Sequence, residues 1–442
     1  MNSKKTKNKN TDKDKNKFYT YRFRIYPNKE QINYLNEQIS YNRFIYNFFL
    51  ERSIHLYKYH NIKFNYIKFQ KIIPLLKKGF PFLKEANSQS LQCSLQSLDK
   101  AYHKFFTKQA GYPNFKKKYS YNSIVIPQSF KIVNNIIQIP KLKSPIKVKF
   151  HRHFYENVNS ISISKTISSK YYVNMLIEKF KFTPYIPKKT LGISTGIDLG
   201  IKDFATITTG TNLDNKQTHK IPNPTILLKS QKKLVKLSKW LDRKVHKRNK
   251  QDKTTASKNY LKFKNKLSLL HEHIFNQRQS FLHKLSSRII NDSQVVVLED
   301  LNIKGMIKNR HLSKSISDVS WNKFVKMIEY KSNWYGRQII KVDRFYPSSK
   351  KCSTLNCDYI YKDLKLSERS WICPKCGAIH DRDINASINL FLEGLIFLLE
   401  YTKKYGSNLS EFTPVEYDTA GYRNIGISRH TMKQEAYQFI DR

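Results

Sequence analysis

The sequence is short of acidic residues and of the residues that usually interrupt regular structure. Its 442 residues include 81 lysines and arginines against 33 aspartates and glutamates, with only 13 glycines and 14 prolines. The formal net charge of +48 would repel itself unless a polyanion neutralised it. The charge therefore favours a nucleic acid as partner. Binding to a membrane surface is the alternative, but the basic residues are spread along the chain and no amphipathic terminal helix concentrates them.

Long hydrophobic runs are missing as well. No apolar run reaches the length of a bilayer span, and the N-terminal stretch MNSKKTKNKNTDKDKNK is too polar for a secretory signal. We therefore expect no membrane contact and an intracellular location, in a prokaryotic cytoplasm or in the nucleus or viral factory of a eukaryotic host. The basic leader, residues 1–17, is expected to be disordered, with a nuclear-localisation or backbone-binding arm as the alternative.

The order of patterns along the chain predicts several domains, and 442 residues are enough for two or three cores. The β-rich stretch KFYTYRFRIYP is followed by Asn28 and Gln31, which resemble a capping box. Helical spacing then dominates residues 28–111, and Ile/Val-rich segments broken by prolines follow. We expect residues 18–27 and 112–188 to form a small β-barrel. Two long basic helices should form a hairpin within 225–290, whose lysine-rich face is either solvated or bound to a nucleic-acid backbone.

Four of the five cysteines fall in one window, at Cys352, Cys357, Cys373 and Cys376. Two close pairs of cysteines are typical of a zinc ribbon with a closed tetrahedral site. Two disulfides are the alternative, which an intracellular location disfavours. His380 is expected not to be a ligand because four thiolates are already available.

Two other features that resemble metal ligands are set aside. Cys93, isolated in an apolar helical stretch, is interpreted as a small buried hydrophobe. The histidines of HEH, residues 271–273, lie two apart on a helix and so cannot face one metal.

Acidic residues stand at three places where strands or helices start or end. Asp198 lies in STGIDLG, Glu299 and Asp300 end a buried strand, and Asp381 and Asp383 open a helix. Three of them have purely structural explanations, Asp198 as a turn residue, Asp300 as a strand terminator and Asp383 as a helix N-cap. Their spacing in the sequence does not show whether they converge.

Several motifs in order resemble the TnpB family of transposon-encoded, RNA-guided nucleases related to type V CRISPR effectors. They are YRFRIYPNKEQ, GYPNFK, GIDLG, LEDLNIKGM, WNKF, PSSKKC, LSERSWICPKCG and DRDINASIN. The resemblance implies an α/β, multi-domain protein with a RuvC-like, RNase H-type nuclease core at 189–350 and 380–400. A zinc ribbon at 351–379 would be inserted in it, and the β-barrel with its inserted helical recognition domain would precede it. Residues 401–442 are expected to form an irregular tail.

The resemblance also implies the site. Asp198, Glu299 and Asp383 match the family's catalytic acids, with Asp381 as an assisting neighbour. Close carboxylates repel one another and need divalent cations, here two Mg²⁺ ions about 3.5–4 Å apart, for hydrolysis that leaves 5′-phosphate ends. This chain departs from the family's pattern in the four residues inside its first cysteine pair and in Ser387, where alanine is usual.

The implied activity is RNA-guided, Mg²⁺-dependent DNA cleavage for a transposable element, with a guide RNA and a target DNA as partners. Two alternatives stay open: a catalytically decayed regulator that binds DNA or RNA, and a transposase that joins strands with the same metal chemistry. The oligomeric state is not predicted.

The charge itself gives a testable prediction. Each phosphate that the protein neutralises releases counterions, so the affinity for RNA and DNA should fall on the order of 10³-fold between about 50 and 200 mM salt. Filter binding or fluorescence anisotropy across this range measures it. An affinity that stays flat would contradict the interpretation of the charge.

Overall fold

The computed structural model describes residues 17–118, 122–154, 157–179, 192–250, 257–365 and 367–405. The chain forms two compact units, residues 1–182 and 183–442, which are treated separately. The predicted disorder of the leader lies outside the described residues, except that Lys17 already belongs to the first strand. The tail was predicted to be irregular from residue 401, but the last helix continues to Tyr405.

The first unit contains a curled seven-stranded sheet in the order β2-β6-β7-β1-β5-β4-β3, with all neighbouring strands antiparallel. Along β1, the alternate residues Phe23 and Ile25 are buried in one apolar core with side chains from the other strands. The strands are β1 (Lys17–Tyr26), β2 (Ser123–Ile126), β3 (Lys131–Val133), β4 (Ile136–Gln138), β5 (Ile146–Lys149), β6 (Val158–Lys165) and β7 (Tyr171–Lys179).

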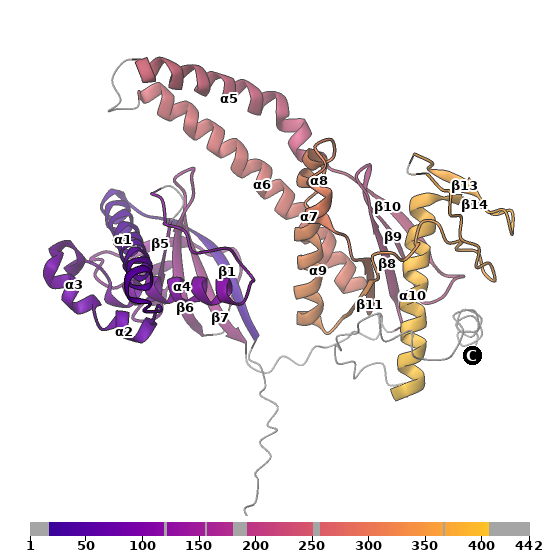
Figure 1. Cartoon of the computed structure of the whole chain (residues 1–442), viewed down its shortest axis with the longest axis horizontal. Helices are drawn as coiled ribbons and strands as arrows, with labels where there is room; N and C mark the ends of the chain where they lie inside the picture. The colour runs from indigo at the N-terminus through magenta and orange to yellow at the C-terminus, as the bar shows by residue number, and fades with distance from the viewer. Residues whose placement is uncertain are drawn as a thin grey trace, which may run out of the picture. The chain divides into compact units, whose positions relative to one another are not determined.

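A helical layer is inserted between β1 and β2 and has its own core, to which each of its helices contributes buried side chains (Figure 1). The predicted capping box is confirmed, because Asn28 and Gln31 each accept a hydrogen bond of 2.9 Å from the other's backbone N–H. Cys93 is half-buried rather than buried. The helices are α1 (Lys29–His60), α2 (Tyr66–Gln70), α3 (Ile73–Gly79), the short 3₁₀ helix η1 (Pro81–Lys84) and α4 (Ser88–Phe106).

The second unit is built on a five-stranded sheet in the order β10-β9-β8-β11-β12. β8, β9 and β10 are antiparallel neighbours, whereas β11 and β12 run parallel to β8. The stretch around Asp198 forms a β-hairpin of β8 and β9, in which Asp198 pairs with Thr206. The strands are β8 (Ser194–Leu199), β9 (Asp203–Gly210), β10 (Gln217–Pro222), β11 (Val295–Glu299) and β12 (Gln338–Val342).

Helices cover both faces of this sheet (Figure 1). Val296 and Leu298 of β11 pack against α6 and α9, whereas Val295 and Val297 pack on the opposite face against α10. The buried strand predicted before Glu299 is therefore confirmed. The helices are α5 (Ile226–Lys250), α6 (Lys258–Asp292), α7 (Ile303–Met306), α8 (Ser313–Val319), α9 (Trp321–Tyr335) and α10 (Arg382–Tyr405).

Helices α5 and α6 confirm the predicted hairpin. They lie side by side, and the rings of Trp240 and Phe263 stack across them with centroids 3.6 Å apart. Figure 1 shows the two helices extending together beyond the sheet.

Helix α10 corrects one expectation from the sequence. Residues Arg382–Lys403 are long and apolar enough, by length and composition, to cross a membrane, although the sequence analysis found no such run. In the structure 67% of the 18-residue window that gives this segment its apolar character is buried inside the protein, because α10 covers one face of the sheet. The apolar length is accounted for by this core packing.

The approach of α10 to β8 is so close that two positions have no room for a side chain. A Cβ at Gly196 of β8 would overlap the backbone of Ser387 and Phe391, and a Cβ at Gly394 would overlap Ser194. The Ser194 hydroxyl donates a 2.9 Å hydrogen bond to the carbonyl oxygen of Phe391. Glycine at these positions therefore sets the distance between helix and sheet.

We expect Gly196→Ala to destabilise the second unit by about 3 kcal/mol, because backbone atoms of α10 must move to admit the methyl group. Thermal unfolding measures the loss. Gly111→Ala is the control, since a Cβ there meets no atom within 4 Å. Equal melting temperatures for the two variants would contradict the close packing.

Candidate functional site

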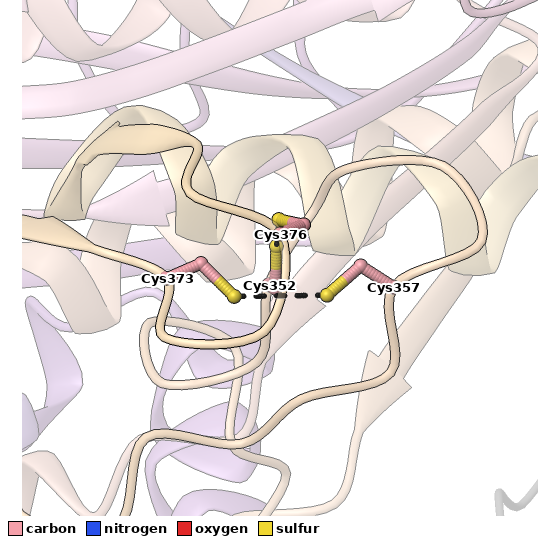
Figure 2. Close-up of side chains that lie close together, drawn as sticks. All are labelled: Cys352, Cys357, Cys373 and Cys376. Carbon is pink, nitrogen blue, oxygen red and sulfur yellow. Dashed lines mark hydrogen bonds between the residues drawn. The ribbon is translucent and has the colours of Figure 1, made fainter.

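The four cysteines of the sequence motif come together in one cluster (Figure 2). Their sulfur atoms all lie within 4.8 Å of one another, with 3.7 Å between Cys352 and Cys376 and 3.6 Å between Cys357 and Cys373. Four sulfurs at about 2.3 Å from a tetrahedral zinc are separated by about 3.8 Å, whereas a disulfide needs about 2.05 Å. The cluster therefore fits a closed zinc site and does not fit disulfides.

Short strands and turns position these thiols. Cys373 follows β13 (Ser370–Ile372), and the turn through Cys376 leads to β14 (Ile379–Asp381). Gly377 adopts φ +70°, a left-handed conformation that favours glycine, and its N–H donates to the Cys373 carbonyl at 2.8 Å. The wide spacing of the first pair is accommodated, since the N–H of Cys352 donates to Tyr359 across a loop.

The thiols of the cluster differ in how readily they ionise, because their surroundings differ. Burial raises the pKa of Cys352 to about 12, whereas the N–H of Ala378 lowers the pKa of the exposed Cys376 to about 6. One thiolate is thus ready to bind a cation, while a buried thiol needs a cation to ionise.

His380 is buried beside the cluster without joining it. Its Nε2 lies 3.1 Å from the sulfur of Cys352, and its ring packs on Trp371 with centroids 4.7 Å apart. Among the described residues, the compact group of ligand atoms consists of the four cysteines. That His380 is not a ligand stays a prediction.

The three carboxylates singled out in the sequence lie at one end of the second sheet. Parallel pairing of Ile197 with Leu298 brings the next residues, Asp198 and Glu299, to the ends of adjacent strands. Asp383 lies in the first turn of α10, which packs on β8. The structure thus brings Asp198 and Asp383, which are 185 positions apart in the sequence, to the same end of the sheet.

Electrostatics shows how strongly these groups interact. Burial raises the pKa of Asp198 well above its usual value, and the charges of Glu299 and Asp383 raise it further. Arg382 and Arg369 oppose this rise. Without a bound cation, three ionised carboxylates are therefore unfavourable here.

Glu299 is held by a neighbour that the sequence analysis did not single out. Burial raises the pKa of Glu299, whereas a hydrogen bond from the Ser348 hydroxyl to Oε1 lowers it. Ser348 belongs to the motif PSSKKC, which was the only sequence signal for it. Arg369 was missed as well, and its guanidinium lies 3.5 Å from Asp383.

The carboxylates do not form a compact single-ion site, since in the described parts of the chain only the cysteines bring three or more ligand atoms within 4.8 Å. Ligands of two ions about 3.5–4 Å apart are spread more widely. Oxygen ligands held near one another against repulsion fit hard divalent cations such as Mg²⁺. Asp198, Glu299 and Asp383 are the candidate ligands at this end of the sheet.

The other two acidic residues have separate partners. Asp381 caps α10, accepting hydrogen bonds from the N–H of Asp383 at 3.1 Å and of Ile384 at 3.0 Å, and pairs with Lys220 at 2.8 Å. Burial works against its ionisation, but Lys220 and these N–H groups outweigh it and lower its pKa. Its assisting role stays a prediction. Asp300 is exposed and pairs with Arg344 at 2.9 Å.

The departure at Ser387 is accommodated inside the core. Its hydroxyl donates to the carbonyl of Ile384 at 2.9 Å and lies 2.7 Å from the Thr208 hydroxyl, which in turn lies 2.9 Å from that of Thr218. A buried hydroxyl costs stability unless it is hydrogen-bonded. Here threonines on β9 and β10 supply partners, so the serine fits.

Two surfaces combine basic and aromatic side chains, as nucleic-acid interfaces do. On the first sheet, the guanidinium of Arg22 lies 4.0 Å from the ring centre of Tyr172, and that of Arg24 lies 5.1 Å from it. On the α5–α6 hairpin, a groove of about 750 Å³ is lined by lysines around Trp240 and Phe263. Both surfaces suit a phosphate backbone with stacked bases.

The cysteine cluster predicts about one zinc ion per chain, measurable by elemental analysis of purified protein. Cys373→Ser should lose the metal and unfold the ribbon locally, because structural zinc sites contribute folding energy. Cys93→Ser is the control, since Cys93 lies far from the cluster in sequence and in another unit. Folded, soluble protein that contains no zinc would contradict the assignment.

The raised pKa of Asp198 predicts a pH-dependent stability. Because the folded pKa is raised, the carboxyl stabilises the fold at acidic pH, and this contribution is lost as pH rises through the folded pKa. Without added divalent cations, Asp198→Asn should therefore melt on the order of 2–4 °C above the wild type at neutral pH.

The difference should shrink as pH falls through the raised folded pKa of Asp198 toward its ordinary unfolded pKa, because the wild-type carboxyl of the folded protein is then protonated. Thermal melts from pH 4 to 8 measure it, with Asp300→Asn as the exposed control. A wild type that is the more stable protein at neutral pH would contradict the repulsion.

Three family models match the chain: "Helix-turn-helix domain" at residues 19–62, "Probable transposase" at 179–310 and "Cas12f1-like, TNB domain" at 321–390. At the first of these, the structure has a strand and one 32-residue helix. The cryo-EM structure of a Cas12f1–sgRNA–target DNA complex matches 85% of this chain and 98% of that chain at 18% identity. The TM-score of this match is 0.33.

Curated relatives match over most of the length. A "Putative RNA-guided DNA endonuclease" of Streptomyces pristinaespiralis is 32% identical over 85% of this chain and 89% of the relative. The "Putative RNA-guided DNA endonuclease InsQ" of Escherichia coli (strain K12) is 29% identical over 71% of this chain and 76% of the length of InsQ. "TnpB-like protein L770" of Acanthamoeba polyphaga mimivirus is 26% identical over 53% and 44%. Identity at this level over this length shows that the chain belongs to the TnpB family.

Proposed function

We propose that this protein is an RNA-guided, metal-dependent DNA endonuclease encoded by a transposable element. The observation that carries the proposal is the convergence of Asp198, Glu299 and Asp383, whose charges act on one another at one end of the second sheet. The descriptions of the relatives from Streptomyces pristinaespiralis and Escherichia coli as RNA-guided DNA endonucleases support it.

We further propose a RuvC-like, RNase H-type core for the second unit. Three antiparallel strands continued by two parallel ones, with helices on both faces, support this fold. The curled sheet and its inserted helices support a β-barrel with a recognition domain. The proposed division is barrel at 18–27 and 112–188, helical domain at 28–111, nuclease at 189–350 and 380–400, and zinc ribbon at 351–379.

The residues of the chain have distinct tasks in this reaction. Asp198, Glu299 and Asp383 would hold two Mg²⁺ ions, which when bound supply an activated water and stabilise the leaving 3′ oxygen of a phosphodiester. Ser348 orients the carboxylate of Glu299 by its hydrogen bond. Arg369 and Arg382 add positive charge beside the acids, which favours the approach of a phosphate group.

The partners follow from charge and family membership. We propose that a guide RNA pairs with the target DNA and supplies sequence specificity, while basic surfaces of the protein bind the backbones. The protein would act inside the cell, where both nucleic acids occur. A purely regulatory binder has no use for three mutually repelling carboxylates, which this chain keeps together at a cost in stability.

The decisive experiment is cleavage of a matched target in Mg²⁺ by single alanine variants. Asp198→Ala, Glu299→Ala and Asp383→Ala should each lower the rate on the order of 10³-fold or more, while RNA and DNA binding stays intact. Asp300→Ala is the matched control, because its side chain is exposed and pairs with Arg344. Near-normal cutting by Asp198→Ala would overturn the proposal, and an inactive wild type that still binds RNA would favour the regulator.

A further inference from the structure

A short loop joins the two candidate metal sites. This loop, residues 348–352, begins at Ser348, whose hydroxyl bonds to Glu299, and ends at Cys352 of the cysteine cluster. Within it, the N–H of Lys351 donates to the Pro347 carbonyl at 2.8 Å. Ser348 and Lys351 are both buried. The placement of the Ser348 hydroxyl therefore depends on what fixes this buried loop.

Two asparagines of α10 fix it. The side-chain N–H₂ of Asn389 donates to the carbonyl oxygens of Ser348 at 2.8 Å and Lys351 at 2.7 Å. Asn385 donates to the Lys351 carbonyl at 2.8 Å and to that of Ser349 at 3.2 Å, and its Oδ1 accepts from the N–H of Ser353 at 3.0 Å. Both asparagines are 1% exposed.

Breaking the hydrogen bonds from Asn385 and Asn389 to the loop would cost stability, and the bonds from Asn389 leave its own amide oxygen without a partner among the described residues. Buried carbonyls that lose a donor cost about 1–3 kcal/mol each, so the loop cannot shift without penalty. Within the described structure, Oδ1 of Asn389 is buried without a hydrogen-bond partner, while the N–H₂ of the same amide serves two carbonyls. The orientation of the Asn389 amide thus satisfies two loop carbonyls and leaves its own oxygen without a partner in this part of the chain.

We propose that Ser348 is a positioning residue for the divalent-cation site, and that Asn385 and Asn389 hold it in place from α10. The serine fixes one oxygen of Glu299 and thereby the direction of the other, which is left for a cation. Because α10 also carries Asp383, the same helix that supplies one ligand aligns a second one. This inference rests on the proposed role of Glu299 in cation binding.

Mn²⁺ binding to the full-length protein, measured by calorimetry, tests the inference without requiring cleavage. Ser348→Ala should weaken the affinity for Mn²⁺ about 10–100-fold, as the loss of a residue that orients a metal ligand does. Ser348→Thr, which keeps the hydroxyl, should restore it. Zinc content and melting temperature should stay close to the wild-type values, because the loop keeps its asparagine contacts.

Ser349→Ala is the matched control. The hydrogen bond from Asn385 to Ser349 goes to its backbone carbonyl, which alanine retains, so Mn²⁺ affinity should not change. Asn389→Ala should weaken Mn²⁺ binding by releasing the loop. Adding Ser348→Ala to it should cause little further loss, since both changes remove the same constraint on Glu299.

The outcomes separate the two proposals. Unchanged Mn²⁺ affinity in Ser348→Ala, or losses from Ser348→Ala and Asn389→Ala that simply add, would overturn the positioning role even if the wild type cuts DNA. A wild type that binds Mn²⁺, loses it on Ser348→Ala and does not cut would overturn the nuclease and keep the positioning role. A wild type that binds no Mn²⁺ would overturn both.

Discussion

The backbone contact between α10 and β8 is the constraint on which the rest of the second unit depends. Gly196 and Gly394 leave no room for side chains at this contact, so the helix lies directly on the strand. Asp198 follows Gly196 by two residues, and Asp383 opens the helix. A wider separation would draw these two carboxylates apart, because each is attached to one side of the contact.

The same helix organises the neighbouring groups. Asp381 caps it, Arg382 and Arg369 offset part of the charge beside it, and its two buried asparagines hold the loop that leads to Glu299 and to the cysteine cluster. The zinc motif and the acidic motif are adjacent in the sequence for a physical reason. The first turn of α10 carries Asp383, and Asn385 in the next turn hydrogen-bonds to Lys351 and Ser353 on either side of Cys352.

The carboxylates at this end of the sheet are electrostatically unfavourable when all of them are ionised. Burial and mutual repulsion raise the pKa of Asp198, so the folded state resists three negative charges at this place. Hydrogen bonding by Ser348 and the nearby arginines reduces this penalty only in part. A site of this kind is less stable empty than filled, which is common where function and stability compete.

Local features were determined by the sequence by itself. The cysteine pairs, the capping box at Asn28, the apolar strand before Glu299 and the basic hairpin all follow from spacing over a few residues. The convergence of Asp198, Glu299 and Asp383 could be predicted from the sequence only through the resemblance to the family. Tertiary structure alone decided the place of Ser348, the ion pair of Asp381 with Lys220 and the burial of α10, because these depend on contacts between residues far apart in the chain, which no local pattern encodes.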